Sequence, residues 1–336
     1  MSEQAVRRAS MTDVAALAGV SHQTVSRVLN SPASVSPQTR ERVEQAIDKL
    51  HYRRNLAARA LAGRHARLIG VLSEMGPWFG PTQSLVAIET GARAMGFVTT
   101  AGVLTNTADL GRTVEQFLDL GVEGAIVVAH DAPTLAVAQT LSAQLPVCLV
   151  SADGECEAAA RVVVDQYGAA RQATRHLIDS GRRHIAHLAG PTDWFDAARR
   201  EEGWRDELAA AGLKAVVQPA GWRAVDGYRA MTALFDSGAR PDAVFAANDM
   251  VALGVIRAAA ETGMDIPQDL AVVGFDDVDG ADQFRPPLTS VRQPFAALGR
   301  AAVEQLGVLL GGHRPSPIIL QPQLVPRASS APRVTR

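Results

Sequence analysis

Apolar residues near the start of the chain recur at the spacing of short helices. The first apolar set is Val14, Ala15, Leu17 and Ala18, and the second is Val25, Val28 and Leu29. Thr12 and Ser21 are suitable N-caps for the two helices. Gly19 lies between them, and glycine adopts the left-handed backbone that a sharp helix ending requires. The pattern predicts two short helices joined by a tight turn.

A third helix is expected to follow. Ser36 is its cap, Pro37 takes the first helical position, and the apolar residues of the next turns are Val43, Ala46, Ile47 and Leu50. Three short helices in residues 10–54 predict a small all-α domain.

From Leu68 onward, short β-rich runs alternate with longer helical patterns. The expected strands are 68–73, 97–104, 124–129, 146–151, 161–165, 184–189, 214–218, 242–247 and 270–275. The clearest helical patterns are 82–95, 108–120, 167–180 and 249–263. A strand near 288–292, a helix over 295–311 and a strand near 317–325 are expected to cross back between two lobes. This alternation is typical of parallel sheets covered by helices, and its length predicts two of them.

The predicted fold is therefore a helix-turn-helix headpiece followed by an α/β core. The headpiece spans 10–54, a short helix spans 55–64 and the core spans 66–329. We expect the first lobe to comprise about 66–163 and 294–322, and the second about 164–293 and 323–329. Two α/β lobes joined by crossing strands resemble the periplasmic sugar-binding fold, which closes on a ligand by hinge motion.

The second helix carries side chains suited to reading DNA. His22, Gln23 and Arg27 lie off its apolar face near the end that enters the major groove in a helix-turn-helix. Glutamine pairs with adenine and arginine with guanine through two hydrogen bonds. The alternative is an ordinary helix pair, since a glycine turn between short helices occurs in many folds.

Charge favours the DNA-binding interpretation. Residues 1–67 hold eleven Arg and Lys against five Asp and Glu, a net charge of +6. The remaining residues hold 22 against 30, a net charge of −8. A basic segment on an acidic body is typical of a domain that contacts phosphates.

Three stretches carry a resemblance to a known family. Residues 18–30, Thr39 to Val43 and Asn55 to Gly63 resemble the headpiece of the lactose-repressor/galactose-repressor family of bacterial transcription regulators. The likeness extends from about Met11 to about Arg327. It implies a homodimeric repressor that binds near-palindromic double-stranded operator DNA and changes affinity when a small molecule, most simply a sugar, occupies the core. The implied DNA-binding positions are Ser21, His22, Gln23, Thr24, Ser26, Arg27, Asn30, Ser36, Thr39, Arg54, Asn55, Ala58 and Leu61.

The segment from Asn55 to Gly63 suits a nine-residue helix that is too short to be stable alone in water. The resemblance implies that it folds in the DNA minor groove, with Leu61 as an apolar wedge between bases. An ordinary tether helix is the alternative. The family usually has a proline between the tyrosine and the asparagine, but this chain has Tyr52-Arg53-Arg54-Asn55, so Arg54 is expected to add a phosphate contact.

Polar and aromatic residues follow the carboxyl ends of the predicted strands, where open α/β sheets bind ligands. These ends include Glu74 with Trp78 and Phe79, His130, Ser151, the loop 193–200, Trp222, Asn248 and Asp276. Carboxylates, amides and aromatic faces together are suited to a polyhydroxylated ring. The family resemblance implies effector contacts for Arg200, Asn248, Asp276, Trp222 and Phe295.

Other interpretations of these positions remain open. Arg200 and Asp276 could form a structural ion pair, and Trp78, Phe79 and Phe295 could be ordinary core residues. Ser151 stands where the lactose repressor has an aspartate, which argues against a galactoside. Trp78 and Phe79 match ring-stacking aromatics of purine-binding relatives, so a nucleoside or base is an alternative effector.

The sequence argues against an enzyme. It has no phosphate-binding loop, no Gly-x-Gly-x-x-Gly after a strand, no Gly-x-Ser-x-Gly and no His-Glu-x-x-His. His184 and His187 are expected on opposite faces of a strand, and the acidic run 276–280 lacks the spacing of a calcium loop. No metal or cofactor is expected. A sugar-binding or sugar-processing protein without a DNA function, or a regulator controlled by a partner protein, are the rival classes.

Composition sets the remaining expectations. Neither a signal-peptide core nor an apolar run of membrane-spanning length is present, so we expect a cytoplasmic protein with no membrane partner. Cys148 and Cys156 are expected to stay reduced. The tail 328–336 contains no leucine heptads, so the expected assembly is a dimer.

Overall fold

The computed structural model describes residues 9–52, 67–74, 76, 78–104, 110–154 and 156–331. The chain divides into two compact units, Met1–Ala66 and Arg67–Arg336. The short helix expected at 55–64, here called the hinge helix, lies outside the described residues with its predicted DNA contacts Asn55, Ala58 and Leu61. Arg54, which precedes it, also lies outside them.

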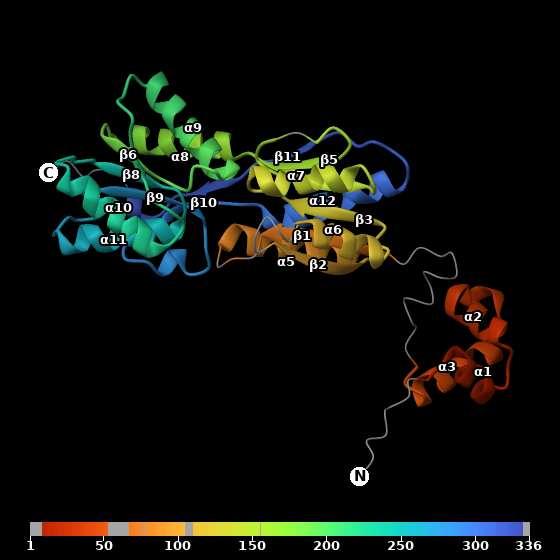
Figure 1. Ribbon diagram of the computed structural model, residues 1–336. Coiled ribbons are helices and arrows are strands. Elements are labelled where there is room, and N and C mark those ends of the chain that lie inside the picture. Colours follow the sequence, from red (N-terminus) through yellow and green to blue (C-terminus); the bar gives the residue numbers. More distant parts are fainter. Residues whose placement is uncertain are drawn as a thin grey trace, which may run out of the picture. The chain divides into compact units, whose positions relative to one another are not determined.

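Residues 9–52, the described part of the first unit, form three short α-helices and one 3₁₀ turn (Figure 1). They are α1 (Met11–Ala18), α2 (His22–Asn30), η1 (Pro32–Ser34) and α3 (Pro37–Lys49).

The helix ends follow local hydrogen bonding. The prediction that Thr12 caps α1 is wrong, because the N-cap is Ser10, two residues earlier. Ser10 and Asp13 form a capping box, in which Asp13 N–H donates to Ser10 Oγ (3.2 Å) and Ser10 N–H donates to Asp13 Oδ2 (2.7 Å). Ser21 caps α2 and Ser36 caps α3, as expected. Gly19 ends α1 with φ 61° in the left-handed region.

The headpiece core is small and apolar. Val14, Val25 and Val43 are completely buried, one from each helix. Leu17 was expected on the apolar face of α1 but is 46% exposed, because the buried stripe of this eight-residue helix passes through positions 14, 15 and 18. Arg42 on α3 donates to the Ala18 and Gly19 carbonyl oxygens and thereby holds the turn.

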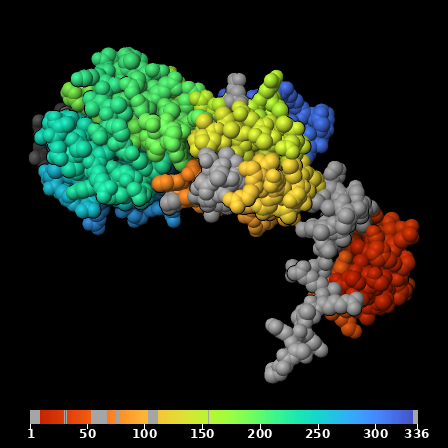
Figure 2. Space-filling view, viewed as in Figure 1, coloured from red at the N-terminus to blue at the C-terminus, as the bar shows by residue number. Residues whose placement is uncertain are grey.

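The second unit consists of two lobes (Figures 1 and 2). Each lobe is built on a six-stranded sheet. The first sheet has the order β11-β5-β4-β3-β1-β2 and the second β12-β10-β9-β8-β6-β7. First-sheet strands are β1 (Leu68–Glu74), β2 (Val98–Leu104), β3 (Gly124–Val128), β4 (Val147–Val150), β5 (Ala160–Val164) and β11 (Ile318–Leu320). Second-sheet strands are β6 (Ile185–Ala189), β7 (Val216–Pro219), β8 (Ala243–Ala246), β9 (Ala271–Asp276), β10 (Thr289–Arg292) and β12 (Gln323–Val325).

All described strand pairs are parallel except β10 with β12. The prediction of a single strand near 317–325 is wrong. This stretch forms two short strands, β11 in the first sheet and β12 in the second, because the chain passes from one lobe to the other at residues 321–322. The chain also passes from one lobe to the other after β5 and after β10. We call these three connections the crossings between the lobes.

Helices cover both faces of each sheet. The first lobe has α5 (Phe79–Ala94) and α12 (Phe295–Leu310) over one core, and α6 (Leu110–Asp119) and α7 (Ala132–Ser142) over the other. The second lobe has α8 (Gln166–Asp179) with α9 (Phe195–Ala210), and α10 (Ala224–Asp236) with α11 (Asp249–Glu261). Two further 3₁₀ turns are η3 (Ala281–Gln283) and η4 (Ala328–Ser330). No helix in the described part of the chain has the length and apolar character needed to cross a membrane.

Glycines let neighbouring helices approach closely. A Cβ added at Gly254 on α11 would lie 2.1 Å from the Ala224 carbonyl oxygen of α10. A Cβ added at Gly227 on α10 would lie 2.3 Å from the Val251 carbonyl oxygen of α11. Because both obstacles are backbone atoms, neither helix can yield without moving as a whole.

We therefore expect Gly254→Ala to lower the free energy of unfolding by about 1–3 kcal/mol through overpacking. Gly307→Ala on α12 is the matched control, since its nearest neighbour would be Met95 Cε at 3.9 Å. That change is expected to be neutral or to stabilise by up to about 1 kcal/mol through helix propensity. Urea titration of both variants measures the difference, and equal stabilities would contradict the close-packing explanation.

Candidate functional site

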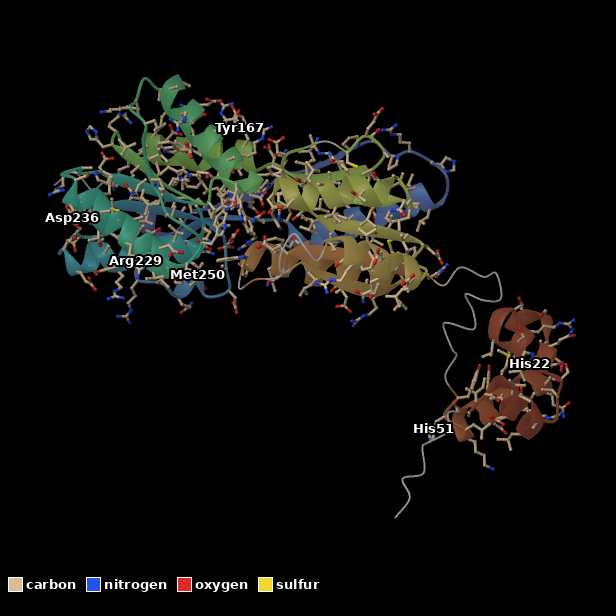
Figure 3. All side chains as sticks on the ribbon, viewed as in Figure 1. His22, His51, Tyr167, Arg229, Asp236 and Met250 are labelled. Atoms are coloured by element: carbon tan, nitrogen blue, oxygen red, sulfur yellow. The ribbon has the colours of Figure 1, made fainter. Side chains whose placement is uncertain are left out.

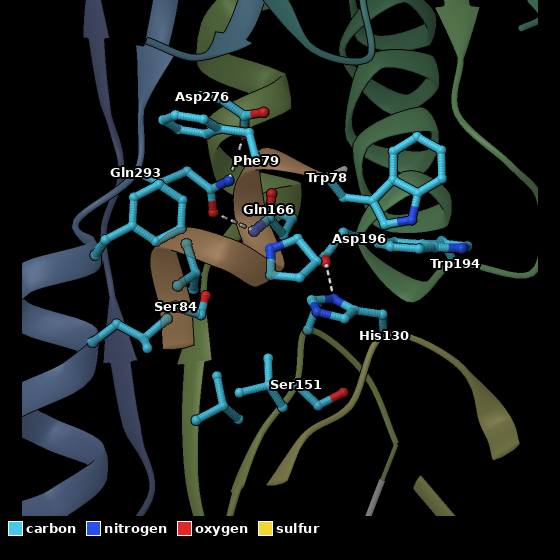
Figure 4. Close-up of a pocket in the computed structure, with 18 of the residues that line it drawn as sticks. Trp78, Phe79, Ser84, His130, Ser151, Gln166, Trp194, Asp196, Asp276 and Gln293 are labelled. Carbon is cyan, nitrogen blue, oxygen red and sulfur yellow. Dashed lines mark hydrogen bonds and ion pairs between the residues drawn. The ribbon is translucent and has the colours of Figure 1, made fainter. Parts of the chain in front are cut away.

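A cavity lies between the two lobes, at the carboxyl ends of strands from both sheets (Figure 4). The first lobe contributes Trp78, Phe79, Ser84, His130, Ser151 and Phe295 to its lining, and the second contributes Trp194, Asp196, Arg200, Trp222, Asn248 and Asp276. Gln166 and Gln293 line it where the chain crosses between the lobes. This is the position at which open α/β sheets bind ligands.

Eight of the nine expected effector residues line this cavity, namely Trp78, Phe79, Ser151, Arg200, Trp222, Asn248, Asp276 and Phe295. Glu74 does not line it. Glu74 ends β1, and its burial together with the charges of Asp131 and Asp193 raises the pKa of its carboxyl group.

The sequence-based candidate set did not include Gln166 and Gln293. Gln166 comes two residues after β5 ends, and Gln293 directly follows β10. Both strands lead into a crossing between the lobes. The strand-end rule would have found both residues had it been applied to the crossings as well as to the loops within each lobe.

Hydrogen bonds and an ion pair join four polar side chains in a ring, namely Gln166 and Gln293 on the crossings and Arg200 and Asp276 in the cavity. Arg200 Nε donates to Gln166 Oε1 (2.9 Å), Gln166 Nε2 donates to Gln293 Oε1 (3.0 Å), and Gln293 Nε2 donates to Asp276 Oδ1 (2.7 Å). Asp276 Oδ1 also lies 3.9 Å from Arg200 Nη2, which closes the ring. Arg200 and Asp276 are thus an ion pair and cavity-lining residues at once.

The guanidinium of Arg200 is buried and has several partners. It lies 3.7 Å from the centroid of the Phe275 ring and 5.7 Å from that of Trp222, and it donates to the Ala247 carbonyl oxygen. Burial lowers the pKa of Arg200, and the nearby carboxylate of Asp276 opposes that effect. Cation–π contacts and hydrogen bonds replace the lost hydration of the cation.

Asp276 and Asp277 adopt positive φ angles of 105° and 52°. These angles are rare for residues other than glycine and indicate backbone strain at the end of β9. Asp276 lines the cavity, whereas Asp277 forms ion pairs with Arg292 (2.6 Å) and Arg327 (2.7 Å). Burial raises the pKa of Asp276 to about 6, although Arg200 and Gln293 act in the opposite direction.

Aromatic rings form a collar around the cavity. Trp78 and Trp194 meet edge to face at 6.3 Å, Trp194 and Trp222 at 5.3 Å, and Phe79 and Phe295 at 5.8 Å between ring centroids. The rings thus pack against one another and also line the cavity. Trp222 Nε1 is buried and has no hydrogen-bond partner within the ranges that the structure describes.

His130 connects the lobes at one wall of the cavity. Its Nδ1 lies 3.0 Å from Asp196 Oδ2, and its ring stacks on Trp194 at 4.9 Å. Burial alone would raise the pKa of Asp196, but the hydrogen bond from His130 and the charges of His130 and Arg200 lower it overall.

The described lining of the cavity has no surplus of cations. Its charged residues are Arg200, Asp196 and Asp276, with His130 as the other titratable group. A phosphate or carboxylate ligand would require additional positive charge. The site is suited to an uncharged molecule with hydroxyl groups and apolar faces.

A second candidate surface lies on the headpiece. His22, Gln23 and Arg27 are exposed on α2, and Figure 3 marks His22 at the start of that helix. Ser21 and Ser36 use their side chains to cap α2 and α3, and each also hydrogen-bonds to the hydroxyl of Thr24 or Thr39 (2.9 Å in both). Thr24 and Ser26 are half-buried, and Asn30 ends α2.

Comparisons with known proteins identify the family of the headpiece and of the core. Residues 10–55 match the family model of bacterial regulatory proteins, lacI family, and residues 174–330 match the periplasmic binding protein-like domain. The lactose operon repressor of Escherichia coli is 32% identical over 88% of this chain and 83% of its own. The HTH-type transcriptional regulator CelR of Thermobifida fusca is 34% identical over 96% of this chain and 98% of its own. The HTH-type transcriptional repressor PurR of Escherichia coli is 30% identical over 96% and 97%.

Solved structures give the same result. The lac repressor dimer bound to operator and an anti-inducer superposes with a TM-score of 0.87 at 30% identity, covering 97% of this chain and 100% of the other. A CelR–cellobiose complex has a TM-score of 0.73 at 30% identity, covering 96% and 100%.

The chain belongs to the lacI family of bacterial regulatory proteins, DNA-binding transcriptional regulators with a periplasmic-binding-protein-like core. The relatives are transcriptional regulators and not enzymes, as the sequence predicts.

Asp249 supports the site from behind the cavity wall. It is completely buried, accepts from Ser290 Oγ (2.5 Å) and from Val278 N–H (2.8 Å), and has no cation among these partners. Burial and the charge of Asp276 raise the pKa of Asp249 to about 8. The folded protein therefore holds this proton between about pH 4 and pH 8, whereas the unfolded chain releases it.

We expect the free energy of unfolding of the wild type to fall as the pH rises from about 4 to about 8, because the unfolded chain releases the Asp249 proton more readily than the folded protein does. Asp249→Asn mimics the protonated acid, because its amide donates to Ser290 and its oxygen accepts from Val278. The variant should match the wild type near pH 4 and become progressively more stable than it by pH 8. Chemical denaturation at several pH values measures this trend, and a constant difference across the window would refute the buried-proton explanation.

Proposed function

We propose that this protein is a homodimeric repressor whose core binds an uncharged polyhydroxylated ring, most simply a sugar. Binding changes its affinity for a near-palindromic operator. The observation that carries the proposal is the cavity between the lobes, with an aromatic collar, an internally neutralised ion pair and no surplus cation.

The chemistry of the lining favours a sugar. Indole rings stack on the C–H faces of a pyranose, while carboxylates and amides pair with its hydroxyl groups. Trp78, Trp194 and Trp222 provide the first kind of contact, and Asp276 and Asn248 provide the second. The CelR relative in complex with cellobiose supports this class of effector.

A purine base is the second candidate, supported by the PurR relative. A flat base would be held best between parallel aromatic faces. Here the ring pairs of the collar lie at 83°, 65° and 74° to one another. These angles favour a three-dimensional ring over a flat one.

Coupling between the sites follows from the three crossings between the lobes. Hinge closure bends such crossings, and two of them contribute a glutamine to the polar ring around Arg200 and Asp276. An effector that engages this ring favours one lobe arrangement over another. By linkage, the factor by which effector changes operator affinity is the factor by which operator changes effector affinity.

The lac repressor dimer bound to its operator supports a dimer here as well. In the headpiece, His22, Gln23 and Arg27 are the proposed base-reading residues. Ser21, Thr24, Ser26, Asn30, Ser36 and Thr39 are proposed to contact the backbone or position the reading helix. Arg54, Asn55, Ala58 and Leu61 remain proposed hinge contacts.

The DNA-reading proposal is tested by Gln23→Ala and Arg27→Ala in gel-shift titrations. The probes are the DNA upstream of the chain's own coding sequence and a random duplex of equal length. Each change should weaken specific binding by about 1–3 kcal/mol, because a bidentate base contact is lost, with a smaller effect on random DNA. Lys49→Ala, an exposed charge at the end of α3, is the control. Equal losses on both duplexes would make the residue a phosphate contact instead.

The effector proposal is tested by thermal shift with sugars and nucleosides, since a binder at 100 times its dissociation constant stabilises by about 2.7 kcal/mol. Asp276→Asn keeps an acceptor for Gln293 but removes the carboxylate charge. It should lose about tenfold or more in effector affinity while still binding the operator, because the charged acceptor makes the stronger hydrogen bond. Asp282→Asn, an exposed change on η3, should leave both activities unaltered. An effector response in Asp276→Asn equal to that of the wild type would exclude Asp276 from the site.

A further inference from the structure

The imidazole of His130 has one buried nitrogen that pairs with no group in the described part of the chain. His130 lies two residues after the end of β3. It is 7% exposed and lines the cavity. Its Nε2 has no hydrogen-bond partner among the described residues. Leaving such an atom unpaired is unfavourable, so a ligand group that pairs with it gains affinity.

The second lobe holds this ring in place through three consecutive residues. Trp194 stacks on it with an interplanar angle of 20°, Phe195 N–H donates to the His130 carbonyl oxygen (2.7 Å), and Asp196 Oδ2 lies 3.0 Å from Nδ1. A further pair across the lobes, Arg199 with Asp153 at 3.7 Å, lies on the next turn of α9. The orientation of the imidazole therefore depends on the lobes being together (Figure 4).

Asp196 also decides which nitrogen is available. The net lowering of its pKa keeps the carboxylate ionised at neutral pH, so it accepts the hydrogen of Nδ1. Nε2 is then the ring nitrogen left for a ligand. A hydroxyl group is suited to this position, because it can donate to a bare Nε2 and accept from a protonated one.

We infer that His130 Nε2 is a specificity-determining contact for one ring hydroxyl of the effector, and that Asp196 is its positioning residue. The inference rests on the proposed function, because it takes a polyhydroxylated ring as the occupant. Since one lobe supplies the imidazole and the other orients it, this contact forms only when the lobes are together. Recognition of that hydroxyl therefore favours the closed arrangement.

The test compares single-hydroxyl deletions of the sugar with substitutions in the protein. D-Glucose, D-galactose, D-mannose, D-xylose and cellobiose are first screened against the wild type by thermal shift. The monodeoxy derivatives of the sugar with the largest shift are then titrated calorimetrically. In the wild type, at least one derivative should bind about tenfold more weakly than its parent, as expected for loss of a buried hydrogen bond.

Four variants assign that penalty. His130→Phe keeps a ring on Trp194 but removes both nitrogens. This variant should bind the parent sugar and the weakly binding monodeoxy derivative with equal affinity. The loss of affinity caused by deleting any other hydroxyl group should persist. Asp196→Ala should also erase the penalty, whereas Asp196→Asn retains an acceptor for Nδ1–H and should preserve it. His313→Phe is the control, an exposed histidine in the loop after α12, and should behave as the wild type.

The outcomes separate the two proposals. If no sugar stabilises the wild type, the sugar-binding function fails, and the inference fails with it. If a sugar binds but every deoxy penalty survives in His130→Phe, the inference alone is overturned. Should His130→Phe fail to fold because Asp196 loses its donor, the contrast between Asp196→Ala and Asp196→Asn decides, and equal penalties in those two variants overturn the inference.

Discussion

Burial of the Arg200 guanidinium is the constraint on which the architecture of the core depends. A cation removed from water must be compensated by charge, hydrogen bonds and aromatic faces. Asp276 provides the charge, Gln166 and the Ala247 carbonyl provide acceptors, and Phe275 provides a ring face. Because Gln166 and Gln293 lie on two different crossings, meeting the requirements of one arginine links the cavity to the segments that would bend when the lobes move.

The helices within each lobe are closely packed. In the second lobe, α10 and α11 meet through Gly227 and Gly254, with no room for a methyl group on either side. In the first lobe, a Cβ at Gly299 on α12 would lie 2.1 Å from the Ala87 carbonyl oxygen of α5. Close packing of this kind resists deformation within a lobe. A ligand that contacts both lobes would therefore change the conformation of the crossings between them. This division between rigid lobes and compliant crossings suits an allosteric regulator.

The site depends both on the fold and on individual side-chain contacts. Family membership accounts for a two-lobed core and a helix-turn-helix headpiece. The stack of His130 on Trp194 and the pairing of His130 with Asp196 are contacts between side chains that follow strand β3 and begin helix α9. Such positions are where members of one fold can diverge in the molecule that they recognise.

The sequence by itself determined the elements and their order. Hydrophobic periodicity located the strands of both lobes and the helices α5, α6, α8, α11 and α12, because one apolar face per element is a local property. The helices α7, α9 and α10 were not among the predicted ranges. The caps Ser21 and Ser36 followed from local chemistry, and Thr12 was wrong only because Ser10 offered a reciprocal partner nearer the start of the helix. The strand-end rule brought seven proposed effector residues to one cavity, since parallel strands end at a common edge, and the family resemblance added Phe295.

Tertiary structure alone decided the rest. Whether Leu17 is buried depended on where α3 lies against α1, and the split of residues 317–325 into two strands depended on which sheet offered a free edge. The ring through Gln166 and Gln293 and the pairing of His130 with Asp196 join residues 127 and 66 positions apart in the chain. No local pattern encodes such pairs, because the free energy that selects them comes from burying polar groups together after the lobes have formed.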